Sequence, residues 1–208
     1  MEPPNWLKFK RRPWLPKVKL VLATHNQGKV QELRAILSPL GFDLIGYDGP
    51  EPIEDGVTFL ENALIKARAA HKHTGLPALA DDSGLQVEIL GGSPGIFTAV
   101  WSGTKDNIAN RRLLLAQLKD IPKTHRQAMF VCTIALVTAN DEISFTGTWP
   151  GSIAFEERGE HGHGYDPVFI PEGFELTAAE LEPDIKNALS HRANALSALI
   201  EYLRSSDV

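Results

Sequence analysis

A junction between a strand pattern and a helix pattern stands near the start of the chain, in LVLATHNQGKV (Leu20–Val30). An apolar run ends abruptly there in a polar turn, and a pattern typical of a helix follows as far as Leu37. Stretches with strand and helix periods alternate along the rest of the chain. This alternation predicts an α/β fold, with a central mixed β-sheet and flanking helices.

The individual elements follow from periodicity and from residues that begin or end helices. The expected strands cover 19–24, 42–47, 127–138 and 142–157, and the last two should pair as a hairpin through 139–142. The expected helices cover 30–37, 58–75, 104–118 and a stretch beginning near 190. Thr58 and Glu61 have the spacing of a capping box, Gly75 supplies a stop, and Thr104 is a candidate cap.

The totals exclude several classes of protein. A net charge of −5 argues against a general nucleic-acid binder, and no apolar stretch reaches membrane-spanning length. Residues 1–17 lack the apolar core of a secretory signal, so we interpret them as an N-terminal extension before a single domain at 18–208. Cys132 is the only cysteine, which excludes an intrachain disulfide and favours the cytoplasm. Its apolar neighbours predict a core position.

The turn in ATHNQGKV resembles a phosphate-binding loop only in part. A Walker loop needs Gly, four residues and then Gly-Lys-Ser/Thr, whereas this chain has Ala23 at the first position and Val30 after Lys29. The hydroxyl that binds magnesium is therefore missing. Free backbone N–H groups at a helix start and Lys29 still suit a phosphate, and Thr24 and Asn26 can add donors. A plain strand–helix turn would explain the same residues.

An acidic doublet, Asp81-Asp82, follows the apolar run PALA, and we expect a strand that breaks there into an acidic turn. Two adjacent acids can bind Mg²⁺ or act as a base, because hard cations prefer carboxylate oxygens. A solvated turn is the alternative. Asn62 and Lys66 are four residues apart and share one helix face, with Glu54 just upstream. A helix packed over this strand end would bring these residues to the doublet.

A glycine-containing loop, HGHGYDPVF, carries His163, Gly164, Tyr165 and Asp166. Glycine lets the backbone approach a flat ligand closely, a ring can stack on a base, and a carboxylate can accept hydrogen bonds from its edge. Metal binding by His161 and His163 is the rival hypothesis, and the sequence places no third ligand beside them.

A cationic group, Lys186, His191 and Arg192, surrounds the start of the last expected helix. These side chains suit a phosphate or the edge of a purine, while a surface helix cap at Ser190 is the alternative interpretation. Together the candidate sites provide three cationic spots, one acidic spot and one ring-binding loop. A nucleoside triphosphate bound with Mg²⁺ needs that set.

Six stretches occur in an order that is far more specific than any one of them: LATHNQGKVQEL, GVTFLENALIKA, ALADDSGLQV, GGSPGIFTAVWSG, GHGYDPVF and NALSHRANAL. Over roughly 18–203 the chain resembles the inosine/xanthosine triphosphate pyrophosphatases. The resemblance implies an elongated α/β fold with a long mixed sheet, two lobes around a deep active-site cleft, and a homodimer. It implies hydrolysis of ITP, dITP and XTP to the monophosphate and pyrophosphate with Mg²⁺, which cleanses the nucleotide pool while normal nucleotides are rejected.

The resemblance also assigns roles by position. It assigns triphosphate binding to Thr24, His25, Asn26, Gln27, Gly28 and Lys29, and a further substrate contact to Ser83. It assigns catalysis to Asp82, Asp81 and Lys66, with Asp82 as the base that activates water, and metal binding to Asp82 and Glu54. It assigns recognition of the base to His163, Gly164, Tyr165, Asp166, Lys186, His191 and Arg192.

Two departures from the family pattern affect these roles. His163 stands where relatives often carry Phe, so less apolar area is offered to a base. Ile53 stands where relatives often carry the first of two acids, which leaves Glu54 alone in that segment. Two other functions stay open: a related hydrolase of modified pyrimidine nucleotides, dUTP or dTTP, and a protein that binds nucleotides without hydrolysing them.

Overall fold

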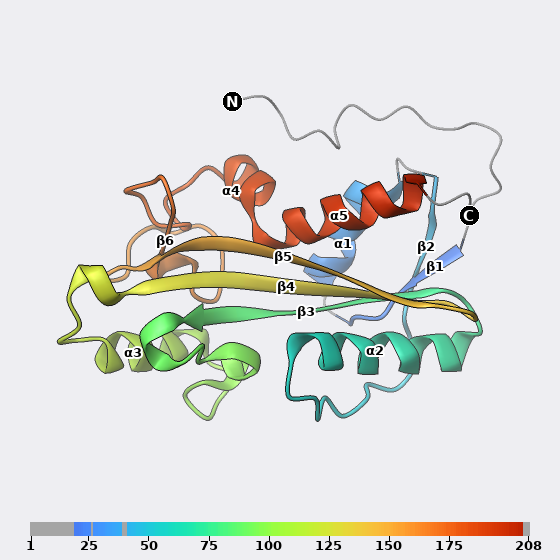
Figure 1. The fold of residues 1–208 in the computed structure, drawn as a ribbon, viewed down its shortest axis with the longest axis horizontal. Coiled ribbons are helices and arrows are strands. Elements are labelled where there is room, and N and C mark those ends of the chain that lie inside the picture. Colours follow the sequence, from blue (N-terminus) through green and yellow to red (C-terminus); the bar gives the residue numbers. More distant parts are fainter. Residues whose placement is uncertain (1–18, 26, 39–40, 206–208) are drawn as a thin grey trace. The chain divides into compact units, whose positions relative to one another are not determined.

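The computed structural model describes residues 19–25, 27–38 and 41–205. The extension at 1–17 and the candidate phosphate ligand Asn26 lie outside the described residues. The six strands are β1 (Lys19–Leu22), β2 (Asp43–Gly46), β3 (Ala78–Val87), β4 (Gln127–Val137), β5 (Glu142–Ile153) and β6 (Phe169–Pro171). They form one sheet in the order β2-β1-β3-β4-β5-β6, in which the three long strands β3, β4 and β5 are neighbours (Figure 1).

The sheet is mixed, as the sequence predicts. β1 pairs in parallel with β2 and with β3, whereas β5 pairs antiparallel with β6. The expected hairpin is confirmed, because β4 and β5 are adjacent and the Thr138 N–H donates to the Asp141 carbonyl at 2.9 Å in the turn between them.

Among the described residues, α-helices accompany the sheet: α1 (Gln27–Leu37), α2 (Phe59–Thr74), α3 (Asn107–Gln117), α4 (Pro183–Leu189) and α5 (His191–Ser205). Short 3₁₀ helices are also present: η3 (Glu88–Leu90), η4 (Gly95–Val100), η5 (Lys123–His125) and η6 (Asp166–Val168). Within the described ranges, every helix is too short or too polar to cross a membrane. The α/β class is confirmed, while α4 and β6 were not expected from the pattern.

The observed ends of α2 and α3 can be compared with the helix caps predicted from the sequence. The capping box of α2 is confirmed, since Thr58 and Glu61 satisfy each other's backbone N–H groups and Gly75 ends the helix at φ +68°. The cap of α3 is Asp106, and the prediction of Thr104 is wrong. A carboxylate two residues closer to the helix reaches the free N–H groups that Thr104 cannot reach.

β3 differs most from expectation, because the strand continues through the acidic doublet instead of breaking there. Ala78, Leu79 and Ala80 are buried on one side of the doublet, and Leu85 and Val87 on the other. Burial of these apolar residues keeps Asp81 and Asp82 in extended backbone, which their own weak strand preference would not do.

The chain divides into two compact units. Of the described residues, the first unit contains those up to Asp82 together with 133–145 and 196–205, and the second contains 83–132 and 146–195. Small side chains fill the core of the first unit: Ala63, Ala67 and Ala70 lie on one face of α2 and let the helix pack closely.

Aromatic side chains fill the core of the second unit. The Phe130 ring lies 4.6 Å from Phe169, and the Phe169 ring lies 5.3 Å from Trp149, between ring centres. Cys132 is fully buried, which confirms its expected core position.

Candidate active site

The candidate phosphate loop is a strand-to-helix turn, as the sequence predicts. β1 ends at Leu22 and α1 begins at Gln27, three residues earlier than expected, so that Lys29 belongs to the first turn of the helix. The Lys29 ammonium group donates to Asp81 Oδ2 at 2.9 Å, and Asp81 is only 5% exposed. The helix start and one member of the acidic doublet therefore lie together in the first unit.

His25 lies in the same turn and is held by two residues that the sequence analysis missed. Its Nδ1 is hydrogen-bonded to Glu51 Oε1 at 2.8 Å, and its ring stacks on Tyr47 at 5.6 Å between ring centres. Tyr47 follows β2, the parallel neighbour of β1, and only the pairing of these strands brings it to the turn. Thr24 is half-buried beside them.

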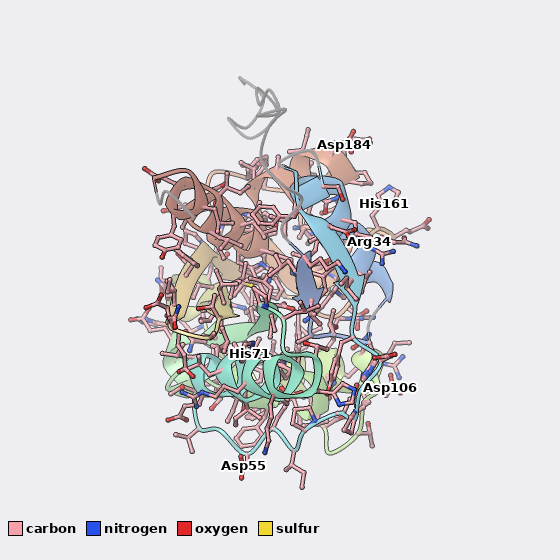
Figure 2. The ribbon with its side chains drawn as sticks, turned by 90° about the vertical axis from the view of Figure 1, so that its right-hand side faces the viewer. Arg34, Asp55, His71, Asp106, His161 and Asp184 are labelled. Carbon is pink, nitrogen blue, oxygen red and sulfur yellow. The ribbon has the colours of Figure 1, made fainter. Side chains whose placement is uncertain are left out.

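Asp82 lies close to the two residues that the sequence predicts on one face of α2. Asn62 donates to Asp82 Oδ2 at 3.2 Å, and the Lys66 ammonium group lies 3.5 Å from Asp82 Oδ1. Lys66 also donates to Glu54 Oε2 at 2.7 Å. The structure thus brings Glu54, Lys66 and Asp82 together, whereas Asp55 is exposed on the loop that leads into α2 (Figure 2).

Burial sets the protonation behaviour of this group. Burial raises the pKa of Asp82 above its ordinary value, against the opposing effects of Lys66 and the Asn62 hydrogen bond. Burial alone would lower the pKa of Lys66, but the carboxylates of Asp82 and Glu54 outweigh it and raise that pKa. Lys66 therefore stays charged, and Asp82 holds a proton more strongly than an ordinary carboxylate, which suits a general base.

The two members of the doublet have different environments because they are consecutive residues of a strand. Successive side chains of a strand point to opposite faces of the sheet. Asp81 is buried and contacts Lys29 of α1, whereas Asp82 is partly exposed and contacts Asn62 and Lys66 of α2. Ser83, the next residue of β3, is half-buried.

The carboxylates of this unit offer few ligands to a metal ion. Within the described ranges, no three or more His, Cys, Asp and Glu side chains gather as a metal-binding group. Mg²⁺ is often held by one or two carboxylates with the remaining positions filled by water and substrate phosphates. Asp82 and Glu54, which share the ammonium group of Lys66, fit that kind of site.

The glycine-containing loop of the second unit folds around Asp166. Asp166 Oδ2 accepts hydrogen bonds from the backbone N–H of His163 and from the Lys186 ammonium group, both at 2.9 Å. Gly162 adopts φ +78°, and a Cβ at this position would collide with the Asp166 carboxylate. The structure therefore joins Lys186 to the predicted loop, and it shows why glycine is needed there.

The two rings of this loop differ in exposure. Tyr165 is 3% exposed and its hydroxyl donates to the Thr98 carbonyl at 3.0 Å, so its ring belongs to the core and offers no face for stacking. Burial also raises the pKa of this hydroxyl well above its ordinary value. His163 is exposed, as is His161 in the same loop, so of the two rings predicted to contact a base His163 is the accessible one.

The remaining candidates lie at the start of α5 or beside the loop. The His191 ring stacks on Phe130 at 4.9 Å between ring centres, and Arg192 follows it, half-buried. Ser190 caps α5 through a hydrogen bond from the Ala193 N–H at 3.2 Å, but it is buried and not on the surface. The ring of His161 extends away from the ribbon (Figure 2).

Known proteins resemble this chain over nearly its whole length. The model of the Ham1 family matches residues 20–202. A dITP/XTP pyrophosphatase of Leifsonia xyli is 56% identical over 192 residues, which are 90% of this chain and 96% of that protein. A dITP/XTP pyrophosphatase of Mycobacterium tuberculosis is 50% identical over 195 residues, 90% of this chain and 96% of that protein.

Solved structures agree with these relatives. A HAM1 protein from Coxiella burnetii has a TM-score of 0.86 at 41% identity, covering 91% of this chain and all 100% of that chain. A nucleoside-triphosphatase / dITP/XTP pyrophosphatase from Mycobacterium abscessus has a TM-score of 0.77 at 47% identity, covering 89% of this chain and 100% of that chain. The sequence match and the shared fold together establish that this chain belongs to the Ham1 family.

Proposed function

We propose that the chain hydrolyses ITP, dITP and XTP to the corresponding monophosphate and pyrophosphate with magnesium, and so cleanses the nucleotide pool. Relatives at 50–56% identity bear the name dITP/XTP pyrophosphatase. The observation that carries the proposal is the pair of lysines held by neighbouring carboxylates of β3, Lys29 on Asp81 and Lys66 on Asp82.

The two lysines suit a triphosphate because each is charged and already oriented by a carboxylate. A phosphate oxygen that reaches another N–H of the ammonium group gains a charge-assisted hydrogen bond at little cost in side-chain ordering. In this proposal the turn that carries Thr24 and His25 adds further donors to the phosphates. The lysines neutralise the charge that develops on the leaving pyrophosphate.

Asp82 is the proposed base. Its carboxylate takes a proton from water as the water oxygen attacks the α-phosphorus, and the bond between that phosphorus and the bridging oxygen breaks. Pyrophosphate leaves with the bonding electron pair. Mg²⁺ supplies charge stabilisation on the phosphate oxygens when bound, and Asp82 and Glu54 would hold it.

In this proposal the second unit recognises the purine base of the nucleotide. Inosine and xanthine carry an oxygen at C6, whereas adenine carries an amine. Donors such as Arg192 or backbone N–H groups would pair with that oxygen and would leave the amine facing an unpaired donor, at a cost of about 1–3 kcal/mol. His163 supplies the ring against which the base packs. Guanine shares the oxygen, so its rejection depends on the space at its 2-amino group.

Two further features belong to the same proposal. A homodimer and a cytoplasmic location are expected from the family resemblance and from the single cysteine. Light scattering on the purified full-length chain measures the first, and fractionation of cells that express a tagged chain measures the second.

The test is the identity of the products. The purified chain is incubated with ITP and Mg²⁺, and nucleotides, pyrophosphate and orthophosphate are quantified over time. We expect IMP and pyrophosphate in equal amounts, and no turnover when a chelator removes the metal. Release of orthophosphate with IDP would overturn the proposed bond cleavage, and binding without turnover would leave a nucleotide-binding protein.

A further inference from the structure

Arg111 of α3 lies beneath the glycine-containing loop and contacts it at two places. Its Nη1 donates to the carbonyl of Gly164 at 2.8 Å, while its Nε and Nη2 donate to Glu157 Oε2 at 3.1 and 2.9 Å. Its side chain is only 12% exposed. One guanidinium group therefore joins Glu157, which precedes the glycine-containing loop, to Gly164 within that loop.

The segment between these contacts is also held at its middle, because the Arg158 N–H donates to the Pro167 carbonyl at 2.9 Å and the His161 N–H to the Ala179 carbonyl at 3.1 Å. Residues 154–164 form no helix or strand, and three of them, Gly159, Gly162 and Gly164, have positive φ. Glycine has more backbone freedom than any other residue, so such a loop samples many conformations unless it is anchored.

The anchors lie on both sides of His163. Its own N–H donates to Asp166, and the carbonyl of the next residue, Gly164, accepts from Arg111. His163 is exposed, and anchored backbone groups lie directly before it, at its own N–H, and one residue after it, at the Gly164 carbonyl. A planar guanidinium with several donors can hold a carbonyl and a carboxylate at once, which a lysine cannot do.

We propose that Arg111 is a positioning residue for recognition of the base, which holds the loop so that His163 presents its ring in one place. The inference rests on the proposed function, because it assigns the ring of His163 to contact with the purine base of the nucleotide. The Glu157 carboxylate balances the charge of Arg111, so the loop is held without a net positive charge beside a neutral purine.

The test compares Arg111→Met with Arg112→Met, which removes the same charge from the exposed neighbouring residue of α3. Steady-state kinetics with ITP give KM and kcat, and calorimetry gives the Kd of IMP. We expect Arg111→Met to raise both KM and the Kd of IMP by about five- to thirtyfold, the loss of one charge-assisted contact. Its kcat stays close to that of the wild type, and Arg112→Met matches the wild type throughout.

Two further measurements separate positioning from mere stability. Inhibition by pyrophosphate with Mg²⁺ should be unchanged in Arg111→Met, since Lys29 and Lys66 of the first unit bind it. Arg111→Lys keeps the positive charge but lacks the planar guanidinium with its several N–H donors. We expect its KM and Kd to match those of Arg111→Met. A folded Arg111→Met with a lower Tm and unchanged KM and Kd would overturn the inference.

Glu157→Gln provides a second route if Arg111→Met does not fold. It leaves the bond to Gly164 but frees the guanidinium from its carboxylate, and we expect a rise in KM of about two- to fivefold. An unchanged KM in that variant would overturn the inference. If the wild type binds IMP but hydrolyses no ITP, the proposed function fails, while the Kd of IMP still decides the role of Arg111.

Discussion

Asp81 and Asp82 are adjacent in the sequence, yet their carboxylates contact different lysines on different helices. Asp81 is buried and pairs with Lys29, whose ammonium group it orients. Asp82 is partly exposed and shares Lys66 with Glu54. We therefore propose that Asp81 positions Lys29 and that Asp82 is the reactive carboxylate.

Asp82→Asn should lower kcat for ITP by about 10²–10⁴-fold, the usual contribution of a general base. The amide keeps the shape of the side chain and can still accept a hydrogen bond from Asn62, so the Tm and the circular dichroism spectrum should stay those of the wild type. Asp81→Asn is the matched control and should chiefly raise KM, because it releases Lys29. Wild-type kcat in Asp82→Asn would remove Asp82 from the mechanism.

His163→Phe should lower KM for ITP by about two- to tenfold, because a larger apolar ring offers a better stacking face to the base. His161→Phe, in the same loop but with its ring extended away from the ribbon (Figure 2), is the control and should leave KM unchanged. Equal effects of both substitutions would show that the base does not contact position 163.

At the scale of the element, the start of α3 depends on one side chain. Asp106 Oδ1 accepts hydrogen bonds from the N–H groups of Ile108 at 2.8 Å and Ala109 at 3.3 Å. Asp106→Ala should cost about 1 kcal/mol and lower Tm by about 2–4 °C, because two helix donors lose their partner. Thermal unfolding of Thr104→Ala, the cap expected from sequence, should match the wild type. The reverse order of the two Tm values would contradict the assignment of the cap.

The turn that follows β6 has a pH-dependent anchor. Glu180 Oε2 accepts a hydrogen bond from the Thr177 N–H at 2.7 Å, which lowers the pKa of this carboxyl below its ordinary value of 4.5. A lowered pKa in the folded state contributes stability above the unfolded pKa, and this contribution is lost as the pH falls through the folded pKa.

The difference in Tm between the wild type and Glu180→Gln should accordingly be largest near neutral pH and should shrink below pH 4.5. Thermal scans over this range measure it. Glu172→Gln, at an exposed position nearby, should show no such dependence. A difference in Tm that stays constant with pH would show that the charge of Glu180 is not involved.

Some elements follow from local chemistry and others do not. The capping box of α2 and the turn before α1 depend on residues within a few positions of each other, and the sequence predicts both. The continuity of β3 through Asp81-Asp82 depends on burial against neighbouring strands, which local preference cannot reveal. The contact of Arg111 with Gly164 also depends on the fold, because the two residues lie 53 positions apart in the chain. Local sequence patterns therefore could not predict it.

At the scale of the whole molecule, the two compact units are not continuous stretches of sequence. The division falls within β3, β4, β5 and α5, so that no linker marks it. Composition therefore gave no sign of a boundary, although the family resemblance implied two lobes. Each unit contains its own group of candidate residues, with lysines and carboxylates in the first and the glycine-containing loop in the second.

In the proposed function the reacting groups belong to the first unit and the groups that recognise the purine base to the second, so substitutions in the glycine-containing loop should change KM and leave kcat close to the wild type. We propose that the chain hydrolyses non-canonical purine triphosphates and spares the normal ones. The most direct test is kcat/KM for pyrophosphate release from ITP, XTP, ATP, GTP and dUTP under one set of conditions with Mg²⁺. We expect ITP and XTP to be hydrolysed fastest, with ATP lower by about tenfold or more and with GTP and dUTP slow. Equal values for ITP, ATP and GTP, or a preference for dUTP, would contradict the claim.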